Sequence, residues 1–175
     1  MSKVEVTTKG IQNRLKSVKP FNAIAEYIWN SFDAYATEVS VNYEANDLGN
    51  ITKLSISDNG SGIPYKNLDL KFKPILSSEK REQNIQQGLL THGKNGLGRL
   101  TFYHFCQTAK WTTRFSEIDK IYQYDIRINS NNLDNYDSSE LVELNRNETM
   151  TGTTVTFENI FELSEHQLKT NVSNF

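Results

Sequence analysis

The most regular pattern of apolar residues in the chain lies between residues 21 and 35. Apolar side chains recur there at steps of three, one, three, four and three, as expected for a helix that buries one stripe. Polar side chains recur at steps of four, three and four and share a different face. The predicted buried stripe is Phe21, Ile24, Ala25, Ile28, Phe32 and Tyr35, and the polar face is Glu26, Asn30, Asp33 and Thr37.

Several other segments show shorter patterns. Alternating apolar and polar residues predict strands, and Asn46, Asp47 and Gly49 supply a turn that makes the first two strands a hairpin. We expect strands over 39–44, 51–57, 109–115, 120–128 and 152–157, helices over 8–17 and 100–106, and a helical polar tail.

Two stretches show no clear period. Residues 63–92 collect Lys, Ser, Gln and Glu and predict a long loop with one short helix, the kind of segment that forms a lid or a binding element. Its basic residues, among them Lys71 and Arg81, are interpreted as charge on a solvated loop rather than as a guide for phosphate or DNA. Residues 129–150 are rich in Asn, Asp, Ser and Glu and predict an exposed excursion.

Composition narrows the class of protein. With 175 residues the chain fits one domain, 1–175, and its net charge of −2 gives no sign of a nucleic-acid or membrane surface. No run approaches the roughly 18 apolar residues of a membrane span. The single cysteine, Cys106, excludes an intramolecular disulfide, and the start of the chain has no apolar signal core. We therefore expect a cytoplasmic protein without a membrane partner.

The first candidate site lies on the predicted helix. A spacing of four places Glu26 and Asn30 one turn apart on one side, where both can act on one ligand. A carboxylate can activate a water molecule, and an amide oxygen suits Mg²⁺. Taken alone, the pair is better explained by an ordinary amphipathic helix with a solvated polar face.

The second and third candidates are glycine-rich. Asp58–Gly62 (DNGSG) follows a strand, and its Asp is able to accept a hydrogen bond from an exocyclic amine such as that of adenine. Taken alone, the segment is better explained as a plain turn. Gly93–Gly98 (GKNGLG) opens a predicted helix, where free amides suit a phosphate. The run matches neither the P-loop nor the dinucleotide-binding pattern. Together the three candidates describe a nucleotide site.

These segments, with Thr151–Thr153, resemble in order the four ATP-site motifs of the GHKL superfamily, which is named after gyrase, heat-shock chaperones, histidine kinases and MutL. The likeness covers about residues 20–160. Its first segment, Asn-Ser-x-Asp-Ala followed by Tyr-Ala-Thr-Glu-Val, is most similar to MutL and MORC-type ATPases.

The resemblance implies a role for each matching residue. Glu26 would be the general base, Asn30 the protein ligand of Mg²⁺, and Asp58 the acceptor of the adenine amino group. Asp33 would lie at the edge of the nucleotide, Gly62 would leave room for the base, and Thr153 would assist through a shared water. The remaining residues implied to bind the nucleotide are Gly60 in the second segment and Gly93, Lys94, Asn95, Gly96, Leu97 and Gly98 in the third.

The resemblance also implies a fold and an activity. The fold would be α+β, a two-layer α/β sandwich of the Bergerat type with a mixed sheet and helices on one face. The activity would be Mg²⁺-dependent ATP binding and hydrolysis, with about residues 63–98 as the lid, a nucleotide-dependent homodimer, and a gating role in a larger machine. DNA or protein clients would bind through regions outside this chain.

The chain departs from its relatives at both ends. Some twenty residues precede the first motif, which leaves no room for the phosphoacceptor helix of histidine kinases. The chain stops soon after the last motif, where gyrase and MutL relatives continue into a transducer domain that supplies a Lys to the γ-phosphate. We therefore expect a truncated or stand-alone module with slow turnover. The alternatives are a non-catalytic ATP sensor and an interaction module without nucleotide.

Overall fold

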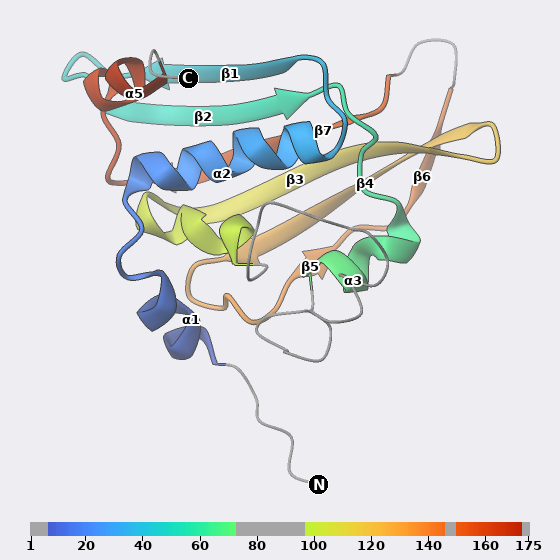
Figure 1. Cartoon of the computed structure of the whole chain (residues 1–175), viewed down its shortest axis with the longest axis horizontal. Coiled ribbons are helices and arrows are strands. Elements are labelled where there is room, and N and C mark those ends of the chain that lie inside the picture. Colours follow the sequence, from blue (N-terminus) through green and yellow to red (C-terminus); the bar gives the residue numbers. More distant parts are fainter. Residues whose placement is uncertain (1–6, 73–96, 146–149, 173–175) are drawn as a thin grey trace, which may run out of the picture.

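A computed structural model describes residues 7–72, 97–145 and 150–172. Figure 1 shows the order of the elements along the chain. They are α1 (Thr8–Leu15), α2 (Pro20–Asp33), β1 (Val39–Ala45), β2 (Ile51–Asp58), the 3-10 helix η1 (Tyr65–Asn67), α3 (Leu68–Phe72), the 3-10 helix η2 (Gly98–His104), β3 (Cys106–Glu117), β4 (Lys120–Asn129), β5 (Asp137–Ser138), β6 (Val142–Leu144), β7 (Gly152–Ile160) and α5 (Glu165–Val172).

The strands form one seven-stranded sheet in the order β1-β2-β7-β3-β4-β5, with β6 paired to β4. The two hairpins, β1–β2 and β3–β4, are antiparallel, and β7 lies between β2 and β3, antiparallel to both. The pairs of β5 and β6 with β4 are antiparallel as well. Within the described residues the sheet is thus antiparallel rather than mixed as expected, because hairpins join neighbouring strands and β7 enters from the opposite direction.

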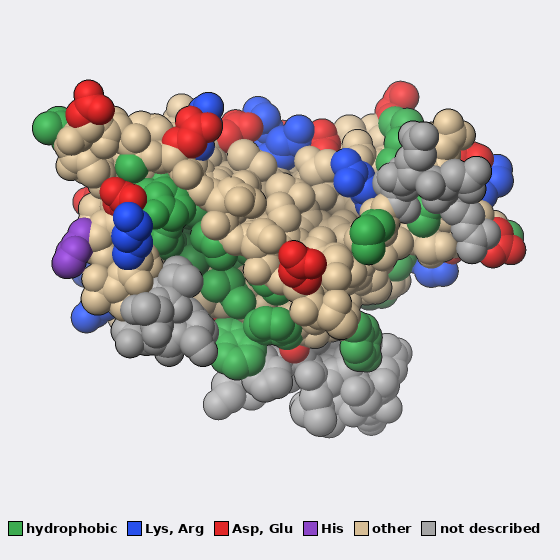
Figure 2. Space-filling view, turned by 90° about the horizontal axis from the view of Figure 1, so that it is seen from above, with side chains coloured by type: hydrophobic (Ala, Val, Ile, Leu, Met, Phe, Trp, Pro, Cys, Tyr) green, Lys and Arg blue, Asp and Glu red, His purple; other side chains and the backbone are tan. Residues whose placement is uncertain are grey.

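The two faces of the sheet differ in character. In Figure 1, α2 and η2 lie in front of the sheet, and the core lies between these two layers. The other face is polar: Ser57 Oγ lies 3.0 Å from Thr154 Oγ1, and the Thr112 hydroxyl donates to Asp125 at 2.7 Å. Figure 2 shows charged side chains along the upper margin of the molecule and hydrophobic ones gathered lower down. The expected two-layer α+β sandwich is confirmed.

Helix α2 packs through a stripe that differs in part from the predicted one. Ile24 is buried as expected, but Phe32 is 48% exposed and Tyr35 is 87% exposed. The helix ends at Asp33, and Tyr35 follows it with a positive φ of 61°. The predicted helix is therefore confirmed, while the far end of its apolar stripe faces solvent.

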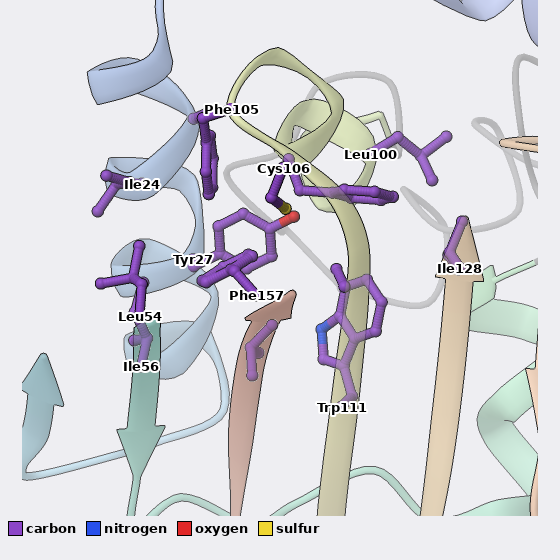
Figure 3. Close-up of a cluster of buried hydrophobic side chains, with 14 of the residues drawn as sticks. Ile24, Tyr27, Leu54, Ile56, Leu100, Phe105, Cys106, Trp111, Ile128 and Phe157 are labelled. Atoms are coloured by element: carbon purple, nitrogen blue, oxygen red, sulfur yellow. The ribbon is translucent and has the colours of Figure 1, made fainter. Parts of the chain in front are cut away.

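Tyr27, which is not in the predicted stripe, is one of the residues through which α2 packs on the sheet. Its ring is 2% exposed and packs edge-on against Phe157, with ring centroids 4.9 Å apart. Its hydroxyl donates a hydrogen bond of 2.7 Å to the carbonyl oxygen of Arg99, so the polar tip is satisfied inside the core. Figure 3 shows this ring among the apolar side chains of the strands. A hydropathy pattern misses such a residue because its burial depends on partners that are distant in the sequence.

The expected elements after residue 97 are confirmed with two changes. The predicted helix over 100–106 is a 3-10 helix that ends at His104, and Cys106 already belongs to β3. The polar excursion contains the short strands β5 and β6, and it buries Leu133, which is 1% exposed. The polar tail forms α5. No helix in the described ranges has the length and apolar character that a membrane span requires.

Candidate functional site

The polar face of α2 turns away from the sheet. Glu26 and Asp33 are half-buried and Asn30 is exposed, whereas Tyr27 and Ser31 of the same helix are buried. The periodicity correctly predicts a shared face for Glu26, Asn30 and Asp33, whereas Thr37 lies beyond the helix, which ends at Asp33. None of the three side chains is buried in the core.

The carboxylate of Glu26 lies against Gly98. A Cβ atom placed on Gly98 would come within 2.4 Å of Glu26 Oε2, so no other residue fits there without displacing the carboxylate. Gly98 opens η2 and closes the glycine-rich third segment. The structure thus brings the candidate base of one segment to the last glycine of another. The two segments are far apart in the sequence: their residues Tyr27 and Arg99, which are joined by a hydrogen bond, are 72 positions apart.

Burial and charge both act on Glu26. Partial burial raises the pKa of its carboxyl group above the ordinary value, and the nearby negative charge of Asp33 raises this pKa further. A carboxylate with a raised pKa is a stronger base than one in water. The environment of Glu26 therefore suits proton abstraction.

Asp58 ends β2 and organises the second segment. Its Oδ1 accepts hydrogen bonds from the backbone N–H of Gly60 at 2.9 Å and of Thr153 at 3.1 Å. Both bonds go to one oxygen of the carboxylate, and its orientation is fixed by the loop on one side and β7 on the other. The structure thus joins the second and fourth segments around Asp58.

The loop after β2 is tied to the end of α2. Asn59 Oδ1 accepts hydrogen bonds from the N–H groups of Thr37 at 2.9 Å and Glu38 at 3.0 Å. The N–H of Ser61 donates to the carbonyl oxygen of Ala34 at 2.8 Å. These bonds hold Asp58 beside the end of α2 that carries Asp33.

Two glycines allow the backbones to approach at this junction. Gly62 has a φ of 69°, and a Cβ there would lie 2.0 Å from the carbonyl oxygen of Arg114 on β3. Gly152 has a φ of 144°, and a Cβ there would lie 2.1 Å from the carbonyl oxygen of Asp58. The structure therefore gives Gly62 a packing reason to be glycine, beside its expected role of leaving room for the base.

One family model matches the chain over residues 18–155, and it is described as histidine kinase-, DNA gyrase B- and HSP90-like ATPase. The chain belongs to this ATPase family. The matched range contains every described residue that the four segments contribute to the site. The resemblance inferred from those segments is thereby confirmed.

Relatives of this ATPase domain include MutL proteins. It is 34% identical over 100 residues to a MutL protein homologue of Schizosaccharomyces pombe, and 33% identical over 78 residues to the DNA mismatch repair protein MutL of Shewanella pealeana. The MutL of Neisseria meningitidis is 32% identical over 80 residues. The matches cover 57%, 45% and 46% of this chain but only 14%, 12% and 12% of the relatives.

Thr113 lies beside Thr153 at the predicted site, and sequence reasoning missed it. Its hydroxyl lies 3.1 Å from that of Thr153 and accepts a hydrogen bond of 2.9 Å from the N–H of Ile63. The residue is fully buried on the inner face of β3. A signal was available, since Thr113 is a polar residue at an inward position between Trp111 and Phe115.

Lys71 on α3 also lies beside the site. Partial burial lowers the pKa of its ammonium group, while the negative charges of Asp33 and Asp58 raise it. The sequence predicts Lys71 as charge on a solvated loop. The structure instead brings its charge near two carboxylates of the predicted nucleotide site, although much of the side chain is exposed.

The third segment is described only at its end. Gly93, Lys94, Asn95 and Gly96 lie outside the described residues. Leu97 is 7% exposed and belongs to the core, so its side chain is directed away from any ligand and only its main chain is available to phosphate.

The donor set fits a magnesium nucleotide better than a metal held by protein alone. Among the described residues, no group of three or more His, Cys, Asp or Glu side chains gathers as metal ligands. Mg²⁺ keeps several waters and is commonly bound through one or two protein oxygens plus substrate phosphates. The exposed amide of Asn30, one turn from Glu26, meets that requirement.

A surface hollow on the polar face of the sheet is separate from this site. It shares no residue with the four segments, and its side chains alternate along β3 and β4 with those of the core. The hollow is lined by Lys110, Asp125, Arg127, Asp137, Ser138 and Ser139.

Proposed function

We propose that this domain binds ATP with Mg²⁺ and hydrolyses it to ADP and phosphate. The observation that carries the proposal is the contact between Glu26 and Gly98, which brings a base to the end of a glycine-rich segment suited to phosphate. Membership of the ATPase family supports the same activity.

Each half of the site has its own task. Asp58, whose Oδ1 already accepts two backbone N–H groups, is proposed to receive the adenine amino group on Oδ2. Asn30 is proposed to hold Mg²⁺, which would neutralise charge on the phosphates. Glu26 takes a proton from the attacking water as the bond between the γ-phosphorus and the bridging oxygen breaks, and later releases that proton to solvent.

The finer part of the proposal concerns conformational change. We infer that nucleotide binding closes about residues 63–98 over the site, drives formation of a homodimer and gates a longer protein. Support comes from α3, which lies in the first part of that segment and carries Lys71 beside Asp33 and Asp58. The MutL relatives, named for DNA mismatch repair, make a DNA or protein client of the longer protein part of this proposal.

Asp58→Asn tests nucleotide binding. Asparagine can still accept the bonds of Gly60 and Thr153, but its NH₂ group cannot accept from adenine. We expect ATP and Mg²⁺ at 100 times the Kd to stabilise the wild type by about 2.7 kcal/mol, and the variant not at all. Thermal unfolding with and without ATP measures this, with Asp47→Asn in the exposed β1–β2 turn as the matched control. Equal stabilisation of both variants by ATP would contradict the role of Asp58.

A non-catalytic ATP sensor is the second candidate, and single-turnover hydrolysis with domain in excess over ATP separates it from an ATPase. The half-buried carboxylate of Glu26 at Gly98 favours catalysis, since a sensor needs no base there. Binding of ATP without any conversion to ADP would decide for the sensor.

A further inference from the structure

Arg99 directly follows the glycine that contacts Glu26. It lies in η2, and its guanidinium group turns inward rather than to solvent, toward the end of α3. The sequence pattern predicts no role for this residue. Its contacts link three elements that meet at the proposed phosphate end of the site.

The guanidinium group holds the end of α3. Its Nη2 donates a hydrogen bond of 2.8 Å to the carbonyl oxygen of Phe72, and its central carbon lies 5.3 Å from the centre of the Phe72 ring. That ring is itself fixed edge-on against Trp111, with centroids 5.4 Å apart. A cation at the carbonyl end of a helix and over an aromatic face is favourable in both respects.

The main chain of Arg99 holds the other side of the junction. Its carbonyl oxygen accepts the hydroxyl of Tyr27 at 2.7 Å, and Tyr27 is the neighbour of Glu26 on α2. In Figure 3 the Tyr27 hydroxyl points from α2 toward Cys106 and Leu100. One residue therefore joins α2, η2 and α3.

Arginine suits this position better than lysine. Burial lowers the pKa of Arg99 to about 10, so the group remains charged at neutral pH, and a planar guanidinium can bond to a carbonyl while it covers a ring. A lysine in its place would keep a charge but lose the planar contact.

We propose that Arg99 is a positioning residue for hydrolysis, which keeps Gly98 against the Glu26 carboxylate by linking η2 to α2 and α3. This inference rests on the proposed ATPase activity. It predicts that loss of the Arg99 side chain lowers the rate of the chemical step more than it lowers the affinity for nucleotide.

The adenine half of the site is held independently of Arg99. Asp58 is oriented by Gly60 and Thr153, and Asn59 is bound to Thr37 and Glu38. None of these hydrogen bonds involves η2 or α3. Affinity for adenine should therefore survive a change that moves Gly98 relative to Glu26.

Arg99→Met and Arg99→Lys test the inference. A displacement of about 1 Å in a reacting group can cost about 100-fold in rate, so we expect Arg99→Met to slow single-turnover hydrolysis by roughly 10- to 100-fold, with the Kd for ATP within about threefold of wild type. The hydrolysis rate of Arg99→Lys should lie between those of the wild type and Arg99→Met. Arg127→Met is the matched control, because it removes an arginine paired with Glu158 on the polar face of the sheet.

The outcomes separate this inference from the proposed function. An unchanged rate in Arg99→Met, or parallel losses of rate and affinity in both variants, would overturn the positioning role. If the wild type binds ATP without hydrolysing it, hydrolysis itself is refuted, and amide hydrogen exchange without nucleotide decides about Arg99. Faster exchange over residues 97–103 in Arg99→Met and Arg99→Lys than in Arg127→Met supports the link, and unchanged exchange refutes it.

Discussion

In its proposed role as the base, Glu26 would serve activity at the expense of stability. Its carboxyl group has a pKa raised by burial and by Asp33, so its ionised form is less favourable in the folded domain than in the unfolded chain. The resulting loss of stability develops as the pH rises above the ordinary carboxyl pKa. A group kept in that state fits a catalytic base better than a structural ion.

Glu26→Ala should abolish hydrolysis and spare binding. General bases commonly contribute about 100- to 10,000-fold to rate, and we expect a loss in that range. Rapid-quench measurement of ADP formation, beside ATP titration of the same variant, provides the test. Exposed Glu38→Ala serves as control. Intact hydrolysis in Glu26→Ala would remove Glu26 from its assigned role.

Asp33→Asn should shift the pH dependence of the reaction. Only ionised Glu26 can accept a proton, so the rate rises with pH through the pKa of this carboxyl. Removal of the negative charge at Asp33 lowers that pKa, and the acid limb of the profile should move to lower pH. Single-turnover rates at saturating ATP across the acid range measure the shift, with Asp47→Asn as control. A profile that stays in place or moves upward would disprove the coupling.

Among the elements, the loop after β2 depends most on backbone geometry. Its hydrogen bonds to α2 and the approach of Gly62 to Arg114 place Asp58, and the sequence DNGSG alone does not distinguish this arrangement from a plain turn. The distinction comes from strand order, since β7 and β3 supply Thr153 and Thr113 to the same junction.

Gly62→Ala should destabilise the domain far more than Gly49→Ala. Both glycines have positive φ, 69° and 76°, which costs alanine about 1–2 kcal/mol. A Cβ on Gly62 also overlaps the Arg114 carbonyl, whereas one on Gly49 meets nothing within 4 Å. Urea unfolding of both variants compares the free energies of unfolding. Equal losses would show that the close approach to β3 is not maintained in solution.

Elements whose burial follows from local periodicity were predicted correctly, and features that depend on long-range contacts were not. The polar face of α2, the first hairpin and β4 were predicted because local periodicity determines them. The positions of Tyr27, Thr113 and Lys71 were not predicted, because each is determined by groups that are distant in the sequence. Tyr27 bonds to Arg99 and Thr113 lies beside Thr153. Lys71 lies near the carboxylates of Asp33 and Asp58. The antiparallel direction of β7 was not predicted either, because its partners β2 and β3 are distant in the sequence.

For the whole molecule, the proposed formation of a nucleotide-dependent homodimer predicts a change in molecular mass when ATP binds. A ligand can shift an association equilibrium only if it binds the dimer better than the monomer. We expect Glu26→Ala, which should retain ATP, to sediment as a dimer with ATP and Mg²⁺ and as a monomer without them. Asp58→Asn under the same conditions is the control. A monomer throughout, with ATP bound, would rule out nucleotide-driven association of this domain.

The position of β7 affects how the domain can form during synthesis. β2 ends at Asp58 and β7 begins at Gly152, yet β7 separates β2 from β3 in the sheet. A nascent chain that has not yet released residues 152–160 from the ribosome therefore lacks its central strand and leaves the edges of β2 and β3 unpaired. Unpaired strand edges can pair with other chains, so the domain is exposed to aggregation until residues 152–160 have left the ribosome and β7 has formed.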